Sequence, residues 1–514
     1  MNPNRTLLAL LVLAATAAAP VSAADASPVL PRSTPEEQGV SSEALLGFVQ
    51  AAEQRIDALH SFMLVRHGRV VAEGWWGPYA AGEPHMLYSL SKSFTSTAVG
   101  LAAAEGKLSV YDPVLKFFPG EAPAVPCRNL ALLRVRDLLR MSTGQRNEDL
   151  MAFPFQGSKD PARVFLELPV PDKPGTHFVY NTAATYMLSA IVQKVTGQTV
   201  LDYLRPRLFE PLGIADPTWE ASSQGVSIGG FGLSVRTEDI AKFGLLYLQR
   251  GQWGGRQLVP ADWVDAATSL QTSNGGSSDS DWDQGYGYQF WRCTHGFYRG
   301  DGAFGQFCIV MPQYDAVVAI TAASRDLQGE INVVWDSLLP ALREGTLPPD
   351  PASDRRLADR LAGLTLRVQA GRPTSPAAAG VSGRRFVFPQ NGRGIESMGL
   401  DVSADGSAVT IAERVGGADE RFACGSGQWA KGTLAGGTAG PVPFAACGAW
   451  TSDDTYTFML CRYRTPFVTT YDMRFAGDQL ILESEDNVGL EGTPRTRIVG
   501  VARAPEASAP AEGR

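Results

Sequence analysis

The chain has 514 residues and a net charge of −8, with 44% hydrophobic and 19% charged residues. This length exceeds what one ordinary core accommodates, so two folded domains are expected. The composition is that of a globular protein and excludes intrinsic disorder over most of the chain. An acidic chain without a Lys/Arg cluster offers nucleic acid no electrostatic footprint, so no nucleic-acid partner is expected.

The N-terminus has the three parts of a secretory signal peptide. Arg5 supplies a positive charge, residues 7–18 are apolar, and residues 21–23 end in a small-x-small cleavage pattern. The apolar stretch is too short to span a bilayer comfortably, and no later stretch reaches about 18 apolar residues. We therefore expect residues 1–23 to be a signal peptide, the mature protein to be periplasmic or extracellular, and no membrane span to remain after cleavage.

Cysteines and histidines give no indication of a metal site. None of the six cysteines lies in a CxxC or His/Cys spacing that is typical of zinc, and the five histidines show no metal spacing. No metal and no cofactor are therefore expected. In an oxidising compartment the cysteines could pair. Cys447 and Cys461 flank a predicted hairpin turn at residues 452–454 and are the first pair to test.

Most elements of the chain before residue 347 are predicted from periodicity, turn residues and caps. In chain order they are a helix over 43–56, strands over 62–65 and 70–76, helices over 89–105, 130–141, 182–196 and 240–248, strands over 285–291, 305–311 and 316–322, and part of a helix over 338–343. Strands and helices are thus mixed in one domain, expected over 30–347.

The chain changes character after this domain. Residues 348–358 begin with a Pro/Asp-rich run and are predicted to be a linker. Residues 359–503 carry short β runs separated by Gly, Asp and Asn, which predicts an all-β accessory domain, either a barrel or a sandwich. Residues 504–514 are rich in Ala, Pro and Glu and are predicted to be a disordered tail.

Ser89 and Lys92 form the candidate reactive pair. Residues three apart lie on one face of a helix, so the Ser89 hydroxyl and the Lys92 amine can meet. A serine hydroxyl needs a base to become a nucleophile, and lysine can be that base if burial lowers its pKa. The helix start also favours a developing oxyanion. The small and apolar residues 98–104 indicate a buried helix; the alternative is that Lys92 reaches the surface.

Residues 88–95, YSLSKSFT, resemble the nucleophile motif of the serine β-lactamase and penicillin-binding-protein superfamily, in its class C and esterase-like branch. Four later segments resemble further family motifs in the same order: residues 138–144, 174–180, 232–239 and 300–306. The resemblance extends over about 35–345. It implies an α+β fold, namely a β-lactamase-like antiparallel sheet flanked by helices with a helical subdomain, here followed by the C-terminal all-β domain. The branch of 6-aminohexanoate-dimer hydrolases and carboxylesterases looks most similar.

The resemblance also implies roles for individual residues. Ser89 corresponds to the nucleophile and Lys92 to the base or proton relay. Tyr180 corresponds to the tyrosine that protonates the leaving group, which a phenol can do if the neighbouring lysine lowers its pKa; alternatively it is a core aromatic residue. The oxyanion hole would consist of the backbone N–H groups of Ser89 and Ala303. Gly302 suits this place because a side chain there would block the substrate.

Two positions depart from the family pattern. The family's Tyr-x-Asn reads Tyr180-Asn181-Thr182 here, so Thr182 stands at the Asn position, and Asn181 and Thr182 are expected to bind substrate together with Asp301, Gly302 and Ala303. The cation of the third motif is absent: Gly300 stands there, with Asp301 next to it. Asp301 would repel a substrate carboxylate, which argues against β-lactams and D-Ala-D-Ala peptides and favours an ester, or an amide with a neutral or cationic group near the carbonyl. Arg299 could reverse this, since strand alternation places it on the same side as Asp301; Asp301 could also be an ordinary turn residue.

The sequence therefore predicts an exported serine hydrolase that forms an acyl-enzyme with a small ester or amide. The alternatives are a β-lactamase, a D-amino-acid peptidase or penicillin-binding protein, and an acylated sensor without turnover. A competing pattern, GxSxG at residues 225–229 with His295 downstream, would make Ser227 an α/β-hydrolase nucleophile, but no buried strand precedes it. The oligomeric state is left open.

Overall fold

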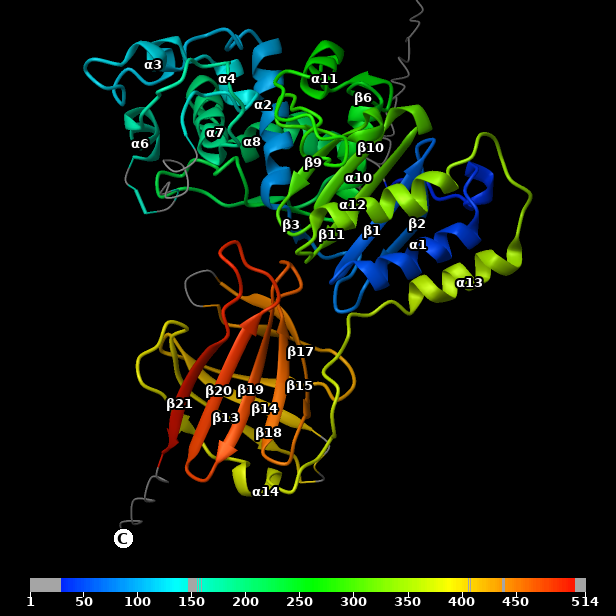
Figure 1. Ribbon diagram of the computed structural model, residues 1–514, viewed down its shortest axis with the longest axis vertical. Helices are drawn as coiled ribbons and strands as arrows, with labels where there is room; N and C mark the ends of the chain where they lie inside the picture. The colour runs from blue at the N-terminus through cyan, green and yellow to red at the C-terminus, as the bar shows by residue number, and fades with distance from the viewer. Residues whose placement is uncertain are drawn as a thin grey trace, which may run out of the picture.

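The computed structural model describes residues 29–503 except 147–154, 156, 159, 405, 407 and 437–439. Figure 1 shows a mixed helix–sheet domain followed by an all-β domain, so the predicted fold class is confirmed. The predicted signal peptide and C-terminal tail lie outside the described residues. Within the described ranges, no helix combines the length and the apolar character needed to cross a bilayer.

The N-terminal domain is built on a six-stranded antiparallel sheet with the order β2-β1-β11-β10-β9-β8. The strands are β1 (Leu59–Arg66), β2 (Arg69–Trp75), β8 (Trp291–Arg292), β9 (Tyr298–Gly302), β10 (Gln306–Met311) and β11 (Ala316–Ala322). The first strand pairs with the last, with Val65 opposite Val317. About 250 residues of sequence separate these two paired strands. The helical part formed within this segment projects from one side of the sheet (Figure 1).

Helices cover both faces of this sheet, which explains why its central strands are buried along their whole length. The flanking helices are α1 (Ser42–Arg55), α2 (Ser91–Ala104), α10 (Thr237–Leu248), α11 (Ala261–Thr268) and α12 (Leu327–Val333). Alternate side chains of β1 belong to two separate cores: Met63 and Val65 pack with α2 and α10, whereas Phe62 and Leu64 pack with α1. The sheet thus separates α2, which begins at the candidate site, from α1.

The helical subdomain packs against α2 (Figure 1). Its helices are α3 (Arg128–Leu132), α4 (Val135–Leu139), α6 (Pro161–Glu167), α7 (Thr182–Thr196), α8 (Val200–Leu204) and α9 (Glu210–Leu212). The single helix predicted over 130–141 is wrong. Leu133 and Arg134 are extended, and the Asp137 side chain accepts the Arg134 N–H at 3.0 Å, which starts a new helix.

The strand predicted over 285–291 is also wrong, except for its last residue. Gly285 and Gln289 have φ values of 98° and 65°, which interrupt an extended chain. A Cβ at Gly287 would lie 2.0 Å from the Ala267 carbonyl oxygen, so the segment is held against α11. Local alternation cannot reveal such a contact, because it depends on residues twenty positions earlier. Short strands pair elsewhere: β3 (His85–Met86) with β5 (Leu233–Val235), β4 (Thr218–Trp219) with β5, and β6 (Gln252–Trp253) with β7 (Arg256–Gln257).

The predicted linker is wrong from residue 351 onward, because Pro351–Ala362 forms helix α13. Asp350 caps this helix by accepting the Ser353 N–H at 3.0 Å. Leu357 is buried in the core that α1 covers, and Arg360 forms an ion pair with Glu53 of α1. The Pro/Asp-rich run that suggested a linker is therefore a helix start, and α13 packs on the N-terminal domain.

The C-terminal domain is one ten-stranded antiparallel sheet that curls into a near-barrel. Its strands are β12 (Phe386–Val387), β13 (Ile395–Val402), β14 (Val409–Val415), β15 (Ala418–Cys424), β16 (Ala430–Leu434), β17 (Val442–Trp450), β18 (Thr455–Cys461), β19 (Val468–Ala476), β20 (Gln479–Asp486) and β21 (Thr496–Ala502). Gly425, directly after β15, bridges to Cys447 of β17 and closes the curl. The short helix α14 (Ala378–Val381) contacts β13.

The cysteine pair singled out from the sequence is not bonded. The register of β17 and β18 places Cys461 opposite Ala445 and Cys447 opposite Met459, so the two cysteines are diagonal neighbours. All six cysteines are free thiols.

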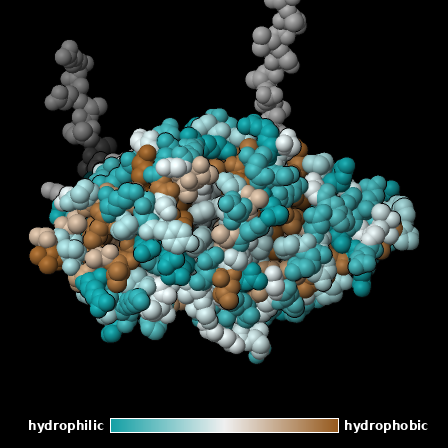
Figure 2. All heavy atoms as spheres, turned by 90° about the horizontal axis from the view of Figure 1, so that it is seen from above, coloured by the Kyte–Doolittle hydropathy of each residue, from teal (hydrophilic) through white to brown (hydrophobic). Residues whose placement is uncertain are grey.

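One end of the near-barrel contacts the N-terminal domain beside β3. The Met86 N–H donates to the Arg464 carbonyl at 2.9 Å, and the Tyr79 hydroxyl donates to the Thr465 carbonyl at 2.9 Å. In Figure 1 the connection between β20 and β21 rises from the near-barrel toward the same region. Figure 2, viewed from above Figure 1, shows apolar side chains scattered among hydrophilic ones, with no single broad apolar patch on that face.

Candidate active site

Ser89 lies in the 3₁₀ turn Tyr88–Leu90, directly before α2 begins at Ser91. The Leu87 N–H donates to the Leu233 carbonyl at 2.8 Å, which ties this turn to the β3–β5 ribbon. Tyr88 has a φ of 48°, a left-handed conformation that non-glycine residues seldom adopt outside functional turns. Ser89 is partly exposed, whereas the helix behind it is buried through Ala102. The hydroxyl is thus presented at the surface of a rigid helix start.

Lys92 is buried at 1% exposure and does not reach the surface. Its Nζ donates to Ser89 Oγ at 2.9 Å and to the Gly230 carbonyl at 2.8 Å. Burial lowers the pKa of Lys92 to about 7, although the nearby Asp301 carboxylate opposes this shift. A large share of the amine is therefore neutral at neutral pH, when it can accept a proton from Ser89. The alternative of a surface lysine is wrong.

Tyr180 joins the same cluster from the start of α7. Its ring stacks on Trp291 with centroids 5.4 Å apart, and Lys92 Nζ lies 4.9 Å from the ring centroid. Burial raises the pKa of the Tyr180 phenol above its usual range, while a hydrogen bond with Ser89 opposes this shift. The expected lowering of this pKa by lysine is therefore wrong. The neutral phenol suits a proton donor better than a base.

Gly302, the last residue of β9, and Ala303 lie beside the serine turn. A Cβ at Gly302 would lie 2.1 Å from the Leu87 carbonyl oxygen, so a glycine is required for the two segments to approach. The predicted reason, that a side chain would block the substrate, stays a prediction beside this backbone contact. Gln306 Nε2 donates to the Ala303 carbonyl at 3.1 Å and holds the turn.

Asn181 and Thr182 have different positions. Asn181 is fully buried: its Oδ1 accepts the Ala184 N–H at 2.9 Å and its Nδ2 donates to Gln145 Oε1 at 2.9 Å. It caps α7, so its predicted contact with substrate is wrong. Thr182 is partly exposed, and its methyl group lies next to Gly230, whose carbonyl binds Lys92.

Asp301 and Arg299 form a buried ion pair at the base of the site. Arg299 Nε donates to Asp301 Oδ2 at 2.9 Å, Arg299 Nη2 lies 2.8 Å from the same oxygen in an ion pair, and Arg299 is 0% exposed. Alternation had correctly placed both side chains on one face of the strand. Because the Arg299 guanidinium partly offsets the carboxylate charge, Asp301 does not act as a free anion toward the substrate, and the expected strong repulsion of substrate carboxylates is corrected accordingly.

Gly300 occupies a position with no room for a cation. A Cβ there would lie 2.2 Å from the Leu90 side chain and 3.0 Å from Ser93 Oγ. The absence of the family's third-motif lysine or histidine is thus built into the packing of β9 against α2. The site therefore lacks a cation that would attract a substrate carboxylate, and it carries no free anion that would repel one.

Asp301→Asn is expected to move the acidic limb of the kcat/KM profile to lower pH by about 0.5–1 unit, because the carboxylate is the charge that raises the pKa of Lys92. A pH series of initial rates measures this shift. Asp262→Asn, which removes an exposed carboxylate on α11, is the matched control and should leave the profile in place. An unchanged limb in Asp301→Asn would show that Lys92 does not set the pH dependence.

The competing GxSxG pattern is not assembled into a site. Ser227 is buried, its carbonyl accepts a hydrogen bond from Ser189 Oγ at 2.6 Å, and it lies in an isolated bridge with Ala221 instead of a strand–helix elbow. Among the described residues there is no group of three or more His, Cys, Asp and Glu side chains that could hold a metal ion.

Sequence reasoning missed two contributors to the site. The Gly230 carbonyl, which binds Lys92, leaves no side-chain signal in the sequence. Trp291, the last residue of a predicted strand, is buried and also stacks on Tyr180.

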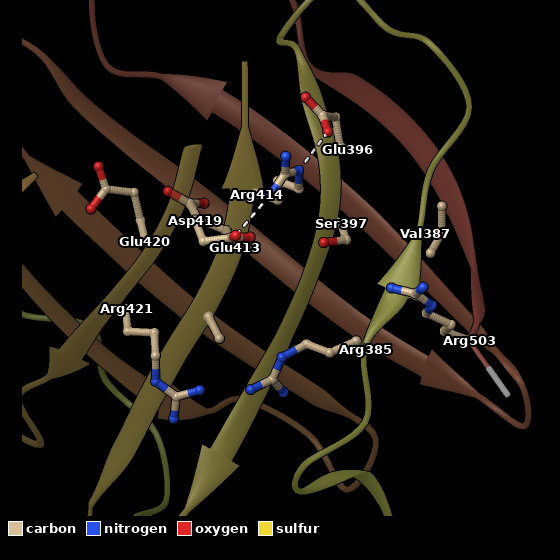
Figure 3. A pocket seen from close by; sticks show the side chains of 11 residues that line it. Arg385, Val387, Glu396, Ser397, Glu413, Arg414, Asp419, Glu420, Arg421 and Arg503 are labelled. Atoms are coloured by element: carbon tan, nitrogen blue, oxygen red, sulfur yellow. Dashed lines mark hydrogen bonds and ion pairs between the residues drawn. The ribbon is translucent and has the colours of Figure 1, made fainter. Parts of the chain in front are cut away.

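A hollow of about 680 Å³, separate from the Ser89 cluster, lies on the outer face of the near-barrel (Figure 3). It is rich in charge, but three of its arginines form ion pairs: Arg414 with Glu396 and Asp419, and both Arg385 and Arg421 with Asp401. Its lining contains no serine–lysine pair like Ser89 and Lys92.

Comparison with known proteins agrees with this geometry. The sequence model of the Beta-lactamase family matches residues 50–336, and the chain belongs to this family, a class of hydrolases that act on amides and esters. It is 28% identical over 312 residues to a 6-aminohexanoate-dimer hydrolase of Paenarthrobacter ureafaciens, covering 55% of this chain and 78% of that protein. It is 26% identical over 250 residues to a putative D-alanyl-D-alanine carboxypeptidase of Escherichia coli K12, covering 43% of this chain and 57% of that protein.

The fold is likewise similar to solved structures. A putative 6-aminohexanoate-dimer hydrolase from Bacillus anthracis superposes with a TM-score of 0.50 at 18% identity, covering 62% of this chain and 89% of that one. A putative beta-lactamase from Bacteroides dorei also has a TM-score of 0.50, at 17% identity, over 59% of this chain and 98% of that one. The resemblance inferred from the motifs is therefore confirmed for the family and the fold.

Proposed function

We propose that the protein is an exported serine hydrolase that cleaves a small ester or amide through an acyl-enzyme on Ser89. The observation that carries this proposal is the 2.9 Å contact between Ser89 Oγ and a buried lysine whose pKa is about 7. A base of this kind can take the serine proton at neutral pH without a histidine. Export is supported by the signal-peptide pattern of residues 1–23.

In acylation, neutral Lys92 accepts the Ser89 proton while Oγ attacks the substrate carbonyl carbon. The N–H groups of Ser89 and Ala303 stabilise the oxyanion. As the carbonyl re-forms, the bond to the leaving group breaks and Tyr180 donates its proton to that group; the proton held by Lys92 then restores the phenol. In deacylation a water molecule attacks the ester, gives its proton to the same groups, and Ser89 leaves protonated.

The preferred substrate is proposed to have no carboxylate next to the reacting carbonyl. The packing at Gly300 leaves no room for a cation, and the neighbouring pair Arg299–Asp301 has no net charge. The similarity to a 6-aminohexanoate-dimer hydrolase supports a linear amide or ester as the substrate. The similarity to a putative carboxypeptidase keeps peptide cleavage as the second candidate, and a sensor that is acylated without turnover is the third.

A substrate panel tests these candidates. Neutral p-nitrophenyl esters and short linear amides should be turned over with a kcat/KM at least about tenfold above that of nitrocefin, because a missing charge partner removes of order 1 kcal/mol or more of binding to the anionic substrate. Efficient nitrocefin hydrolysis would contradict the substrate assignment. A single burst of product followed by no turnover would identify the sensor instead.

A further inference from the structure

A pocket of about 460 Å³ lies between the two domains, next to the predicted oxyanion donor. Ala303, Phe304 and Leu327 line it from the N-terminal domain, while Val488 and Leu490 line it from the connection between β20 and β21. This connection rises from the near-barrel toward the N-terminal domain in Figure 1. The volume falls in the range of small-molecule sites.

Phe304, which lines the pocket, belongs to an aromatic cluster that both domains build. The rings of Tyr88 and Phe304 meet edge-on with centroids 5.2 Å apart, and Phe467 of the near-barrel lies 6.0 Å from Phe304. Tyr88 and Phe304 both have left-handed backbones, with φ values of 48° and 67°, and each adjoins one of the two predicted oxyanion amides. The near-barrel therefore packs directly on the segments that carry Ser89 and Ala303.

The connection is anchored, so the pocket is preformed. The Arg325 guanidinium donates to the Asn487 carbonyl at 2.9 and 2.6 Å. Val488 is 2% exposed and belongs to the same apolar cluster as Phe304. In contrast, Leu490 is 77% exposed, although it lines the pocket. A ligand that covers Leu490 would remove its apolar surface from water.

The pocket lies on one particular side of the reacting centre. Its lining includes Ala303 but neither Lys92 nor Tyr180. The leaving group must face Tyr180 to receive its proton, so the Ala303 side is left for the acyl group. No carboxylate lines the pocket, and its one cation, Arg325, is bound to a backbone carbonyl.

We propose that this interdomain pocket binds the acyl part of the substrate, an uncharged and largely apolar chain, and that Leu490 of the C-terminal domain sets the preferred chain length. The proposal rests on the proposed function of Ser89. It gives the C-terminal domain a role in substrate recognition, because without the β20–β21 connection one wall of the pocket is missing.

The test uses the full-length protein and p-nitrophenyl esters from acetate to octanoate, so that only the acyl chain changes. Wild-type kcat/KM should rise with chain length by up to about fourfold per buried methylene. Leu490→Ser should lower the octanoate-to-acetate ratio roughly five- to tenfold and leave acetate within about twofold. Leu490→Met should restore the ratio. Leu132→Ser, which changes a 43% exposed leucine on α3, is the matched control and should leave the ratio unchanged.

The outcomes separate this proposal from the proposed function. Ester hydrolysis that survives in Ser89→Ala would overturn the proposed function. Ser89-dependent hydrolysis with the same octanoate-to-acetate ratio in wild type and Leu490→Ser would overturn the pocket proposal alone. So would an effect of Leu490→Ser that appears only when the alcohol part of the ester is varied, in a series of alkyl acetates. If no ester is turned over, the chain-length preference is measured instead from the labelling rates of Ser89 with short- and long-chain alkyl fluorophosphonates. Absence of labelling would overturn both the proposed function and the pocket proposal.

Discussion

Ser89→Ala is expected to lower kcat for any substrate by at least about 10⁴-fold and to abolish covalent labelling by a fluorophosphonate. The hydroxyl oxygen is the atom proposed to form the acyl-enzyme, and it is the atom that Lys92 Nζ contacts at 2.9 Å. The substitution removes one partly exposed oxygen, so the fold should be unaffected. Steady-state kinetics, peptide mapping of the labelled protein and urea denaturation measure the three expectations.

Ser227→Ala serves as the control for this result, because Ser227 is the serine of the competing pattern and its side chain is buried. It should keep both activity and labelling. The opposite outcome, with Ser227→Ala inactive and Ser89→Ala active, would replace the mechanism entirely.

Lys92→Ala is expected to lower kcat by at least about 100-fold, the usual scale for a general base. Lys92→Arg should not restore activity, because a guanidinium stays protonated at neutral pH. In the wild type kcat/KM should rise with pH through about 7, as the buried amine loses its proton, and then level off. Stopped or continuous ester assays between pH 5 and 9 measure the limb; an active Lys92→Arg would limit Lys92 to an electrostatic role.

The buried Lys92 amine that is proposed to serve catalysis is also expected to lower the free energy of unfolding near neutral pH. Burial lowers the pKa of Lys92 from 10.5 in the unfolded chain to about 7, so the folded state binds fewer protons across that range. Below pH 10.5 the wild type therefore loses free energy of unfolding progressively as the pH falls toward 7. Lys92→Met, which has no charge to desolvate, should lack this dependence and unfold at a higher urea concentration at pH 7.5, while remaining inactive.

Local sequence determined the elements whose signals are contained within a few residues. The helix Thr182–Thr196 was predicted with the bounds it has, because Asn181 caps its start and Gly197 adopts a left-handed conformation at its end. The strand Ala316–Ala322 was likewise predicted from its apolar run. The i, i+3 spacing of Ser89 and Lys92 requires only one helical turn, so their contact also followed from the sequence.

Tertiary structure decided the features that depend on distant residues. The Lys92 amine has a pKa near 7 because surrounding elements exclude water from it, and the Gly230 carbonyl that binds it lies 138 residues away. The charge of Asp301 could not be judged until Arg299 was seen to bind it. Phe304 and Val488, which line the interdomain pocket and pack in one cluster, belong to different domains. Spacing reveals contacts within a turn or a strand, whereas burial and charge neutralisation are properties of the packed chain.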